Sequence, residues 1–351
     1  MKKKIFIYFL LIFLLILGVL ILYQKNNRLL PIRYPQYSSD LKNKANILLI
    51  AKDALIIGKK KLPNGKEEPI LEKKSRSDII NIIHIDFDKG KVKILNIPRD
   101  MLVSIPNYTK EKSKKDFNNL DKINHSYFYG GETLLIKTIK KNFNIDIDRY
   151  LTVDFVRFQK LITFLKPFVK VFQIRKFKTE EPAVVKELLK NRFIYPYDDI
   201  DRSRNSLFFI KYLCEKIYPQ INPLNFLVFK KIFWEVFKGA TNLNEDDINK
   251  IFIELKEKNF DPKDIELGVM IGYQANVYLN RFSQTLSCYL PIYEEIEKQI
   301  KYFIYDSTNI SPKFYLSNNE SFFIPEYVKR DYAFSFDLDT INLRIRVEIP
   351  K

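Results

Sequence analysis

The strongest constraint on the fold is a polar block that lies between two regular elements. Residues 91–97 alternate as a β-strand does and lead directly into Pro98, Arg99 and Asp100. A second polar block, at residues 121–131, precedes apolar residues at helical spacing over residues 132–143. Charged groups at the end of a buried strand are costly unless something binds them. The sequence therefore predicts a polar site where strand and helix meet.

Further charged groups accompany two other predicted strands. Arg76 and Asp78 stand just before an apolar strand at residues 79–86, and a strand at residues 46–50 leads to Asp53. In sheets flanked by helices, ligands usually bind outside the strand ends, where the backbone leaves an opening. We therefore expect these groups to line one crevice together with the first polar block.

Strands and helices are mixed along the first half of the chain. Residues 79–86 and 91–97 form a predicted hairpin around a turn that contains Gly90. After the helix at residues 132–143, the pattern indicates a strand at 149–155 and a helix at 156–165. This mixture predicts an α/β or α+β core with a central mixed β-sheet flanked by helices.

The remaining segments carry weaker signals. The charged, turn-rich segment 58–69 is expected to be a mobile loop. Helices are expected at residues 203–217 and 242–259. From residue 271 the chain is Tyr-rich and strand-like, and it ends in an alternating strand at residues 340–349. Aromatic stripes of this kind more often belong to a packed core than to a groove for a long apolar ligand, so a core is the favoured interpretation.

The N-terminus has the pattern of a membrane anchor. Three lysines, Lys2 to Lys4, precede an uncharged apolar run at residues 5–23, long enough to cross a hydrocarbon core of about 30 Å. The run lacks the small-residue cleavage site of a signal peptide and a cysteine for lipid attachment. We expect an uncleaved, single-pass transmembrane helix with a cytoplasmic N-terminus, although Lys25 and Arg28 reduce the charge asymmetry.

The chain is accordingly divided into five predicted parts. They are a cytoplasmic tail at residues 1–4, a transmembrane anchor at 5–23, a juxtamembrane linker at 24–44, a main domain at 45–270, and a strand-rich C-terminal extension of unknown role at 271–351. In this topology everything beyond the anchor lies outside the cytoplasm, at the cell membrane.

The whole chain is basic, with a formal net charge of +17, and the three N-terminal lysines supply little of it. A basic surface attracts polyanions such as nucleic acid, anionic lipid head groups or phosphate-bearing glycopolymers. The predicted topology argues against nucleic acid. Outside the motifs, the lysine excess is equally well explained by solubility and composition.

The cysteines and histidines do not suggest metal or redox chemistry. Cys214 shares an apolar helical face, which favours a buried free thiol over a disulfide with Cys288. The chain has only two histidines and no Cys-x-x-Cys motif, so a zinc site is not expected. His84 lies among isoleucines in a predicted strand and is interpreted as a structural histidine.

The charged residues described above resemble, in type and spacing, the LytR-CpsA-Psr family, whose members ligate glycopolymers to bacterial cell walls. The residues that carry the resemblance are Asp53, Arg76, Asp78, Arg99 and Lys122. The Asp-Lys-Ile-Asn and Tyr-Gly-Gly block is close to the usual family sequence, with His125 where the family usually has a small residue. The resemblance covers roughly residues 46–210. It implies that residues 45–270 form a catalytic domain.

The resemblance implies a substrate that consists of a polyprenyl chain, a pyrophosphate and a glycan. The phosphoglycan would be transferred to a peptidoglycan hydroxyl. Phosphoryl transfer needs positioned cations, and Mg²⁺ typically takes one or two carboxylates plus phosphate oxygens. We therefore assign Asp53 and Asp78 as Mg²⁺ ligands. The predicted pyrophosphate clamp consists of Arg76, Arg99 and Lys122, and the planar Arg99 fork suits two phosphate oxygens.

A second half of the site is implied by a family motif in which an Arg-x-Arg pair precedes an Asp-x-x-Arg-x-x-Arg-Gln run that opens a helix. The matching residues Lys190, Arg192 and Arg202 are assigned to pyrophosphate binding, and Arg202 is also assigned a catalytic role together with Arg99. Three positions differ from the family: Lys190 replaces an arginine, Asn205 replaces an arginine and Ser206 replaces the glutamine. Arg204 is adjacent but points about 100° away from Asn205 on a helix.

Asp199, the first residue of that helical motif, is the candidate general base for the acceptor hydroxyl. The alternative is that Asp199 only complements the dipole at a helix N-terminus. Asp201 is a competitor for the role of base.

Three functional hypotheses follow. The first is a membrane-anchored, Mg²⁺-dependent glycopolymer phosphotransferase, with a pyrophosphatase side activity as a further option. The second is a non-catalytic relative that binds polyprenyl phosphates or wall polymers, suggested by Lys190, Asn205 and Ser206. The third is a membrane-tethered nucleic-acid-binding regulator, suggested by the basic charge alone, and it requires a cytoplasmic C-terminus.

Overall fold

The structure is a computed structural model. It describes residues 35–307 except 54–55, 62–66, 73, 107–119, 175–176, 180–197 and 280–283, and it also describes 315–316 and 335–336. The predicted anchor at 5–23 and the predicted strand at 340–349 lie outside the described residues. Among the helices that the structure does describe, none is both long and apolar enough to cross a membrane.

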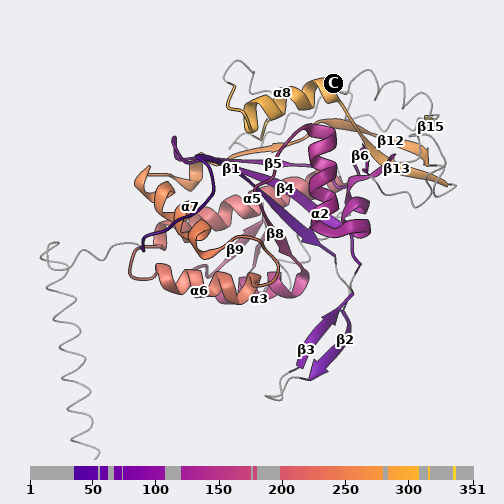
Figure 1. The fold of residues 1–351 in the computed structure, drawn as a ribbon. Helices are drawn as coiled ribbons and strands as arrows, with labels where there is room; N and C mark the ends of the chain where they lie inside the picture. The colour runs from indigo at the N-terminus through magenta and orange to yellow at the C-terminus, as the bar shows by residue number, and fades with distance from the viewer. Residues whose placement is uncertain are drawn as a thin grey trace, which may run out of the picture.

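The centre of the molecule is a six-stranded mixed β-sheet (Figure 1). The strand order is β14-β11-β5-β4-β1-β8. The strands are β1 (Lys44–Lys52), β4 (Ser77–Asp86), β5 (Lys91–Asn96), β8 (Arg149–Val153), β11 (Glu266–Val269) and β14 (Tyr315–Leu316). Sequence reasoning located the first four, and the antiparallel β4–β5 hairpin is confirmed.

Strand direction decides which residues meet at one edge of this sheet. β1 runs parallel to β8, β5 runs parallel to β11, and β4 is antiparallel to both β1 and β5. The carboxyl ends of β1, β5, β8 and β11 therefore lie at the same edge as the start of β4. This end of the sheet is formed by strand termini and not by an outermost strand. We call it the active edge, and we call the opposite end of the sheet the far edge.

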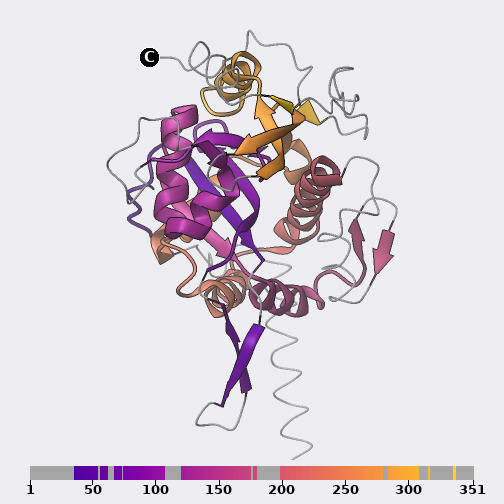
Figure 2. The same ribbon diagram turned by 90° about the vertical axis from the view of Figure 1, so that its right-hand side faces the viewer.

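Helices cover both faces of the sheet (Figure 2). On one face, Leu48, Ile80 and Leu95 pack with the helices α2 (Ile123–Phe143) and α8 (Tyr293–Phe303). On the other face, Ile47 and Ile94 pack with residues of α5 (Asp198–Ile217) and α7 (Glu245–Glu257). Successive strand residues point to opposite faces, so near-continuous apolar strands can supply both cores. The expected architecture of a mixed sheet flanked by helices is confirmed.

The remaining elements surround this core. They are β2 (Ile56–Lys61), β3 (Glu67–Leu71), β6 (Leu102–Ser104), β7 (Leu120–Lys122), α3 (Phe155–Leu165), β9 (Phe172–Ile174), β10 (Phe177–Thr179), η2 (Tyr218–Gln220), α6 (Phe226–Phe237), η3 (Pro262–Asp264), β12 (Gly272–Leu279), β13 (Gln284–Pro291) and β15 (Ser335–Phe336). β12 and β13 form an antiparallel hairpin that packs on Leu102 of β6 and Leu120 of β7.

Helix α2 begins earlier than the sequence pattern indicated and bends at its glycines. The pattern predicted a helix only from residue 132, whereas helical structure begins at Ile123. Gly131 has φ 61° and ψ −152°, a conformation that side-chain-bearing residues rarely adopt. The Asp-Lys-Ile-Asn block therefore opens a short first helical segment of its own, before the kink.

Two other expectations were wrong. The segment at 58–69, expected to be a mobile loop, contains most of the antiparallel β2–β3 hairpin, which projects from the body of the molecule (Figure 1). Both faces of a projecting hairpin are exposed to solvent. Its strands are therefore highly charged and lack the apolar alternation by which a half-buried strand is predicted. The strand-like C-terminal region also contains helix α8, whose residues Ile296, Ile300 and Phe303 recur at helical spacing and are buried.

Candidate active site

The active edge holds most of the described residues that the sequence assigned to a site. Asp53 follows β1, Arg76 precedes β4, Asp78 is the second residue of β4, and Arg99 follows β5. The backbone N–H of Asp53 donates to the carbonyl of Arg76, with 3.2 Å between N and O, which ties the first two of these ends together. The register of three neighbouring strands thus places these residues at the same end of the sheet.

Two arginines converge on the carboxylate of Asp78. The Arg99 Nη1 donates to Asp78 Oδ1 at 2.5 Å. The Nη1 of Arg202, from α5, lies 4.0 Å from the same oxygen, and its Nη2 lies 3.5 Å from the Asp78 carbonyl oxygen. Arg202 is buried, while the side chain of Arg99 is 19 % exposed. Asp78 therefore holds two guanidinium groups side by side at the edge of the sheet.

A second ion-pair chain connects Arg99 to Lys122. Asp100 Oδ2 lies 3.8 Å from Arg99 Nε, and Asp100 Oδ1 lies 3.2 Å from Lys122 Nζ. The Lys122 side chain is 15 % exposed, so it is neither sealed in the core nor free in solvent. Two carboxylates thus hold three cationic side chains in one partly open region.

The loop that carries Arg99 is fixed by its own backbone. The N–H of Met101 donates to the Pro98 carbonyl, and the N–H groups of Ile123 and Asn124 donate to the carbonyls of Met101 and Arg99. These bonds are 2.8 to 3.1 Å long. The two polar blocks recognised in the sequence are therefore directly hydrogen-bonded to each other, which positions Arg99 and Lys122 without a ligand.

Asp121 anchors the start of α2 and was not assigned a role from the sequence. Its carboxylate is buried and accepts from the Lys122 N–H at 2.7 Å and from the Tyr129 hydroxyl at 2.6 Å. His125 Nδ1 lies 2.7 Å from the same carboxylate. The sequence did offer a signal, because Asp121 stands directly before the assigned Lys122 in the Asp-Lys-Ile-Asn block. A buried carboxylate needs several hydrogen-bond partners, and the structure supplies them. The ring of His125 is engaged by Asp121, one residue before Lys122.

Tyr127, also near the start of α2, is not suited to acid–base chemistry. Its hydroxyl donates to Glu132 Oε1 at 3.0 Å, and Thr152 donates to the same oxygen at 2.9 Å. Burial, and after it the negative charge of Glu132, raises the pKa of Tyr127 well above its ordinary value. The phenol therefore stays protonated and acts as a hydrogen-bond donor.

Asp53 and Asp78, the two carboxylates assigned from the sequence, are the groups that could hold a magnesium ion at the active edge, although Asp78 Oδ1 already accepts from Arg99. Asp53 and Asp78 stand at neighbouring strand ends, and Mg²⁺ is commonly bound by one or two carboxylates together with waters and phosphate oxygens. Within the described part of the chain, no cluster of three or more His, Cys, Asp or Glu side chains is arranged for a metal ion. Such a site would therefore depend on these two carboxylates and on oxygens from a substrate.

The second half of the predicted site is only partly described. Lys190 and Arg192 lie outside the described residues. Asp199 falls in the first turn of α5, as does Asp201 just after it, and nothing is described of either side chain. Of the assigned residues on this side, only Arg202 is seen to reach the active edge.

Two of the positions that differ from the family motif, Asn205 and Ser206, are buried, as is the adjacent Arg204. Arg204, Asn205 and Ser206 are all at most 7 % exposed. The Ser206 hydroxyl donates to the Ser203 carbonyl at 2.7 Å, within the helix. Neither amide atom of Asn205 has a hydrogen-bond partner among the described residues. A buried amide without partners is costly, so this position is a point of strain or of unmet binding capacity next to Arg202.

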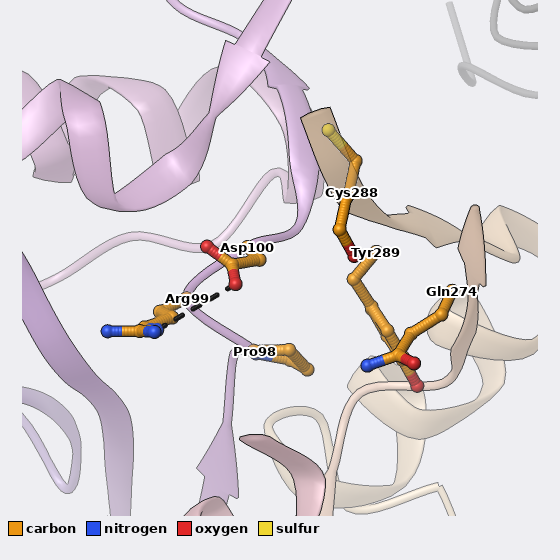
Figure 3. A pocket seen from close by; sticks show the side chains of 7 residues that line it. Pro98, Arg99, Asp100, Gln274, Cys288 and Tyr289 are labelled. Atoms are coloured by element: carbon orange, nitrogen blue, oxygen red, sulfur yellow. Dashed lines mark ion pairs between the residues drawn. The ribbon is translucent and has the colours of Figure 1, made fainter. Parts of the chain in front are cut away.

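A small pocket that opens to solvent adjoins Arg99 (Figure 3). One wall is formed by Pro98, Arg99 and Asp100. The opposite wall comes from the β12–β13 hairpin, and it consists of Gln274, Ser287, Cys288 and Tyr289. Sequence reasoning missed this second wall, because nothing in the local sequence around Gln274 indicates that it meets Arg99.

Residues 24–192 match the model of the LytR_cpsA_psr family. Over 136 residues the chain is 32 % identical to the regulatory protein MsrR of Staphylococcus aureus (strain COL), a match that covers 39 % of this chain. Over 91 residues it is 33 % identical to the polyisoprenyl-teichoic acid–peptidoglycan teichoic acid transferase TagU of Oceanobacillus iheyensis, covering 24 % of this chain and 25 % of TagU. The match spans only 35 % of the length of MsrR.

The fold is also similar to a solved structure. The crystal structure of Bacillus subtilis TagV superposes with a TM-score of 0.55 at 18 % sequence identity. That superposition covers 76 % of this chain and 100 % of the TagV chain. The similarity extends well beyond residue 192, so the architecture of the later elements is shared as well.

Proposed function

Residues 24–192 belong to the LytR_cpsA_psr family, and on this premise we propose that the chain is a transferase that attaches a cell-wall glycopolymer. In detail, it would move a phosphoglycan from a polyprenyl-pyrophosphate carrier onto a peptidoglycan hydroxyl. The observation that supports this most is the convergence of Arg99 and Arg202 on Asp78 beside an open pocket. The name of the relative TagU supports the same class of reaction.

The chemistry follows from the charges at the active edge. A phosphoryl group in transfer carries negative charge on its equatorial oxygens, and positioned cations stabilise it. Arg99 and Arg202 present two guanidinium groups, and Lys122 adds a third cation within the same ion-pair network. Arg76 is exposed at the mouth of this edge, where it can meet the pyrophosphate as it arrives. Lys190 and Arg192 are proposed to complete the clamp.

In the proposed step, the acceptor hydroxyl oxygen forms a bond to the phosphorus that carries the glycan. The bond between that phosphorus and the bridging oxygen breaks, and polyprenyl phosphate leaves. The hydroxyl proton passes to a carboxylate base, for which Asp199 is our candidate and Asp201 the competitor, both in the first helical turn of α5. Mg²⁺ held by Asp53 and Asp78 would neutralise part of the phosphate charge.

The proposed setting is the outer face of the cytoplasmic membrane. Residues 5–23 would anchor the chain, with residues 1–4 inside the cell and the domain outside, near its polyprenyl-linked substrate. A reporter fused after Lys351 should be active only outside the cytoplasm. Activity of that reporter inside the cell would instead favour a cytoplasmic regulator that binds nucleic acid.

The test of the reaction compares wild type with Arg99→Ala. The purified full chain in detergent is given a polyprenyl-pyrophosphate glycan, with and without Mg²⁺, and release of polyprenyl phosphate is followed. We expect metal-dependent turnover that falls by about 10²-fold or more in Arg99→Ala, the usual loss when one transition-state donor is removed. Arg99→Lys keeps the charge but not the planar fork, so it should restore turnover only in part.

A non-catalytic role is the alternative, and a specific observation favours it. Asn205 and Ser206 occupy positions where the family motif has an arginine and a glutamine, and the Asn205 amide is buried without partners among the described residues. Such a relative would bind polyprenyl phosphates or wall polymers without turnover. Tight binding of the glycan carrier by wild type, with no product over long incubation, would support this reading over the transferase.

A further inference from the structure

We propose that the pocket between Arg99 and the β12–β13 hairpin binds the first sugar of the carried phosphoglycan, with Gln274 and Ser287 as its hydrogen-bonding residues. This inference rests on the proposed function. It assigns a role to a hairpin that lies beyond the residues matched by the family model.

The hairpin has one polar and one apolar face. Residues paired directly across an antiparallel hairpin share a face, and the register pairs Gln274 with Tyr289 and Asn276 with Ser287. The next pair along, Ala275 and Cys288, points to the other face and is buried against β6 and β7. Figure 3 agrees, since the Cys288 sulfur is directed away from Gln274.

Backbone contacts hold the polar face of the hairpin beside the loop that carries Arg99. The N–H of Tyr289 donates to the Asp100 carbonyl at 2.8 Å, and Met101 forms a parallel β-bridge with Tyr289. In the sequence, Asp100 directly follows Arg99, and Met101 is the next residue after Asp100. A ligand whose phosphate meets Arg99 therefore has its next chemical group within reach of this face.

The side chains of the pocket match the chemistry of a sugar ring. Gln274 and Ser287 are exposed, and within the described part of the chain no hydrogen bond or ion pair involves either side chain. An amide and a hydroxyl can donate to and accept from ring hydroxyls. Pro98 and Tyr289 also line the pocket, but both are largely buried and add only a small apolar surface for the C–H face of a pyranose.

The same side chains argue against binding of the pyrophosphate or of the prenyl chain in this pocket. Arg99 is the single cation among the residues that line the pocket, so the pocket does not serve as a second phosphate clamp. Its two polar groups and one carboxylate, Asp100, are poorly matched to a prenyl chain. The pocket is small and opens to solvent, so it would contact one face of a sugar and let the rest of a polymer leave.

The experiment separates the sugar from the pyrophosphate. Binding of two probes to the full chain in detergent is measured by calorimetry: farnesyl pyrophosphate, and the same compound carrying one N-acetylglucosamine on its pyrophosphate. Wild type should bind the glycosylated probe more tightly. The double variant Gln274→Ala/Ser287→Ala should bind the glycosylated probe about tenfold more weakly, the effect of two lost hydrogen bonds, and the other probe unchanged.

Two further variants keep the test specific. Gln284→Ala, at the tip of the same hairpin and paired with Leu279 on the apolar face, should leave both affinities unchanged. Ser287→Tyr should fill the pocket and weaken only the glycosylated probe. Equal affinities of wild type for both probes, or equal losses in the double variant, would overturn the sugar subsite. Failure of wild type to bind farnesyl pyrophosphate would instead overturn the proposed function itself, in which case Arg99→Ala would also have no effect.

Discussion

Both edges of the central sheet carry clusters of charged residues, yet the two clusters are built differently. The far-edge cluster consists of Lys44, His84, Asp86, Lys93 and Asp306. There, Lys93 and Asp306 are 7 % and 9 % exposed and joined at 2.9 Å. At the active edge, Arg99 and Asp78 are 19 % and 20 % exposed, and Arg99 lines a pocket.

The far-edge cluster is centred on Asp306. Asp306, which follows α8, receives hydrogen bonds from Lys44 at 2.6 Å and from Lys93 at 2.9 Å. Burial alone would raise the pKa of Asp306, but the hydrogen bonds from Lys44 and Lys93 outweigh it and hold that pKa well below its ordinary value. Lys93 also donates to the Tyr302 carbonyl at 2.8 Å, so the cluster fastens the end of α8 to the sheet.

The comparison teaches how to separate structural charges from functional ones in this protein. A buried charge whose bonds are all satisfied by protein groups stabilises the fold and has nothing left to offer a ligand. A cation that is partly exposed next to a pocket can exchange a protein carboxylate for a phosphate. By this criterion the Lys93–Asp306 pair at the far edge is structural and Arg99 at the active edge is functional, although both edges contain similar residue types.

The largest expected effect is on stability, at the far edge. Asp306→Ala should lower the free energy of unfolding by about 3–5 kcal/mol, because it leaves Lys93 buried without its counter-charge. Arg99→Ala should change it by less than about 1 kcal/mol, since that pair is partly exposed. Urea denaturation of both variants measures the difference. Similar losses in the two would break the distinction between the edges.

The next effect is the pH dependence of the far edge. Burial lowers the pKa of His84 to about 4, from 6.5 for an ordinary histidine. The unfolded chain therefore takes up a proton more readily between those values. Stability is complete above pH 6.5 and falls by up to about 3 kcal/mol as the pH drops through this window. His84→Gln should flatten the curve between pH 6.5 and 4 in denaturation experiments. An unchanged slope in the variant would assign the effect to another group.

Below pH 4, we assign the further loss of stability to Asp306. Its pKa is lowered in the folded state, so its contribution is complete above the ordinary aspartate value of 3.8 and is lost as the pH falls further. Asp306→Asn should remove this second phase while leaving the His84 phase visible, which separates the two groups within one titration.

A smaller effect is expected at the kink of α2, on the active-edge side. Gly131→Ala should cost about 1–3 kcal/mol, because Gly131 has φ 61° and ψ −152°. Since the kink sets off the short helical segment that follows Lys122, turnover should fall as well. Gly58→Ala, where a Cβ meets only Ile70 Cδ1 at 3.6 Å, is the matched control and should be close to neutral. Equal stability of the two variants would show that the kink is not strained by a side chain.

The smallest effect concerns the thiols. Burial raises the pKa of Cys288, beside the active-edge pocket, to about 12, and burial raises that of Cys214 to about 11. Both are free, as the sequence predicted for Cys214. Neither should react with a disulfide reagent at pH 8 in the folded chain, and both should react in urea. Rapid labelling of Cys288 in the folded chain would add a reactive thiol to the active edge.

Much of the active edge was predictable because its residues sit next to strongly patterned strands. The apolar runs before Asp53 and after Asp78, and the alternation before Arg99, placed these residues at strand ends, and the structure brings the three ends together. His84 was likewise interpreted correctly as structural, since it is buried and its Nδ1 lies 2.8 Å from Asn46 Oδ1. The Mg²⁺ assignment and the role of Asp199 stay predictions.

Other features could not be read from local pattern. The β2–β3 hairpin is charged on both faces, so it carried no apolar alternation, and α8 lies in a Tyr-rich region whose β-propensity masked its helical spacing. Asp306 gave no signal at all, because its importance depends on lysines at the start of β1 and β5.

The sequence by itself determined the mixed sheet, the residues at its strand ends and the resemblance to a glycopolymer-ligating family, because these depend on short-range periodicity and on the order of charged residues. Only the tertiary structure decided that Asp306 joins the lysines of the far edge, and that Gln274 and Ser287 line one pocket with Arg99. Such contacts join segments far apart in the chain, where burial and pairing are set by packing and not by neighbouring residues.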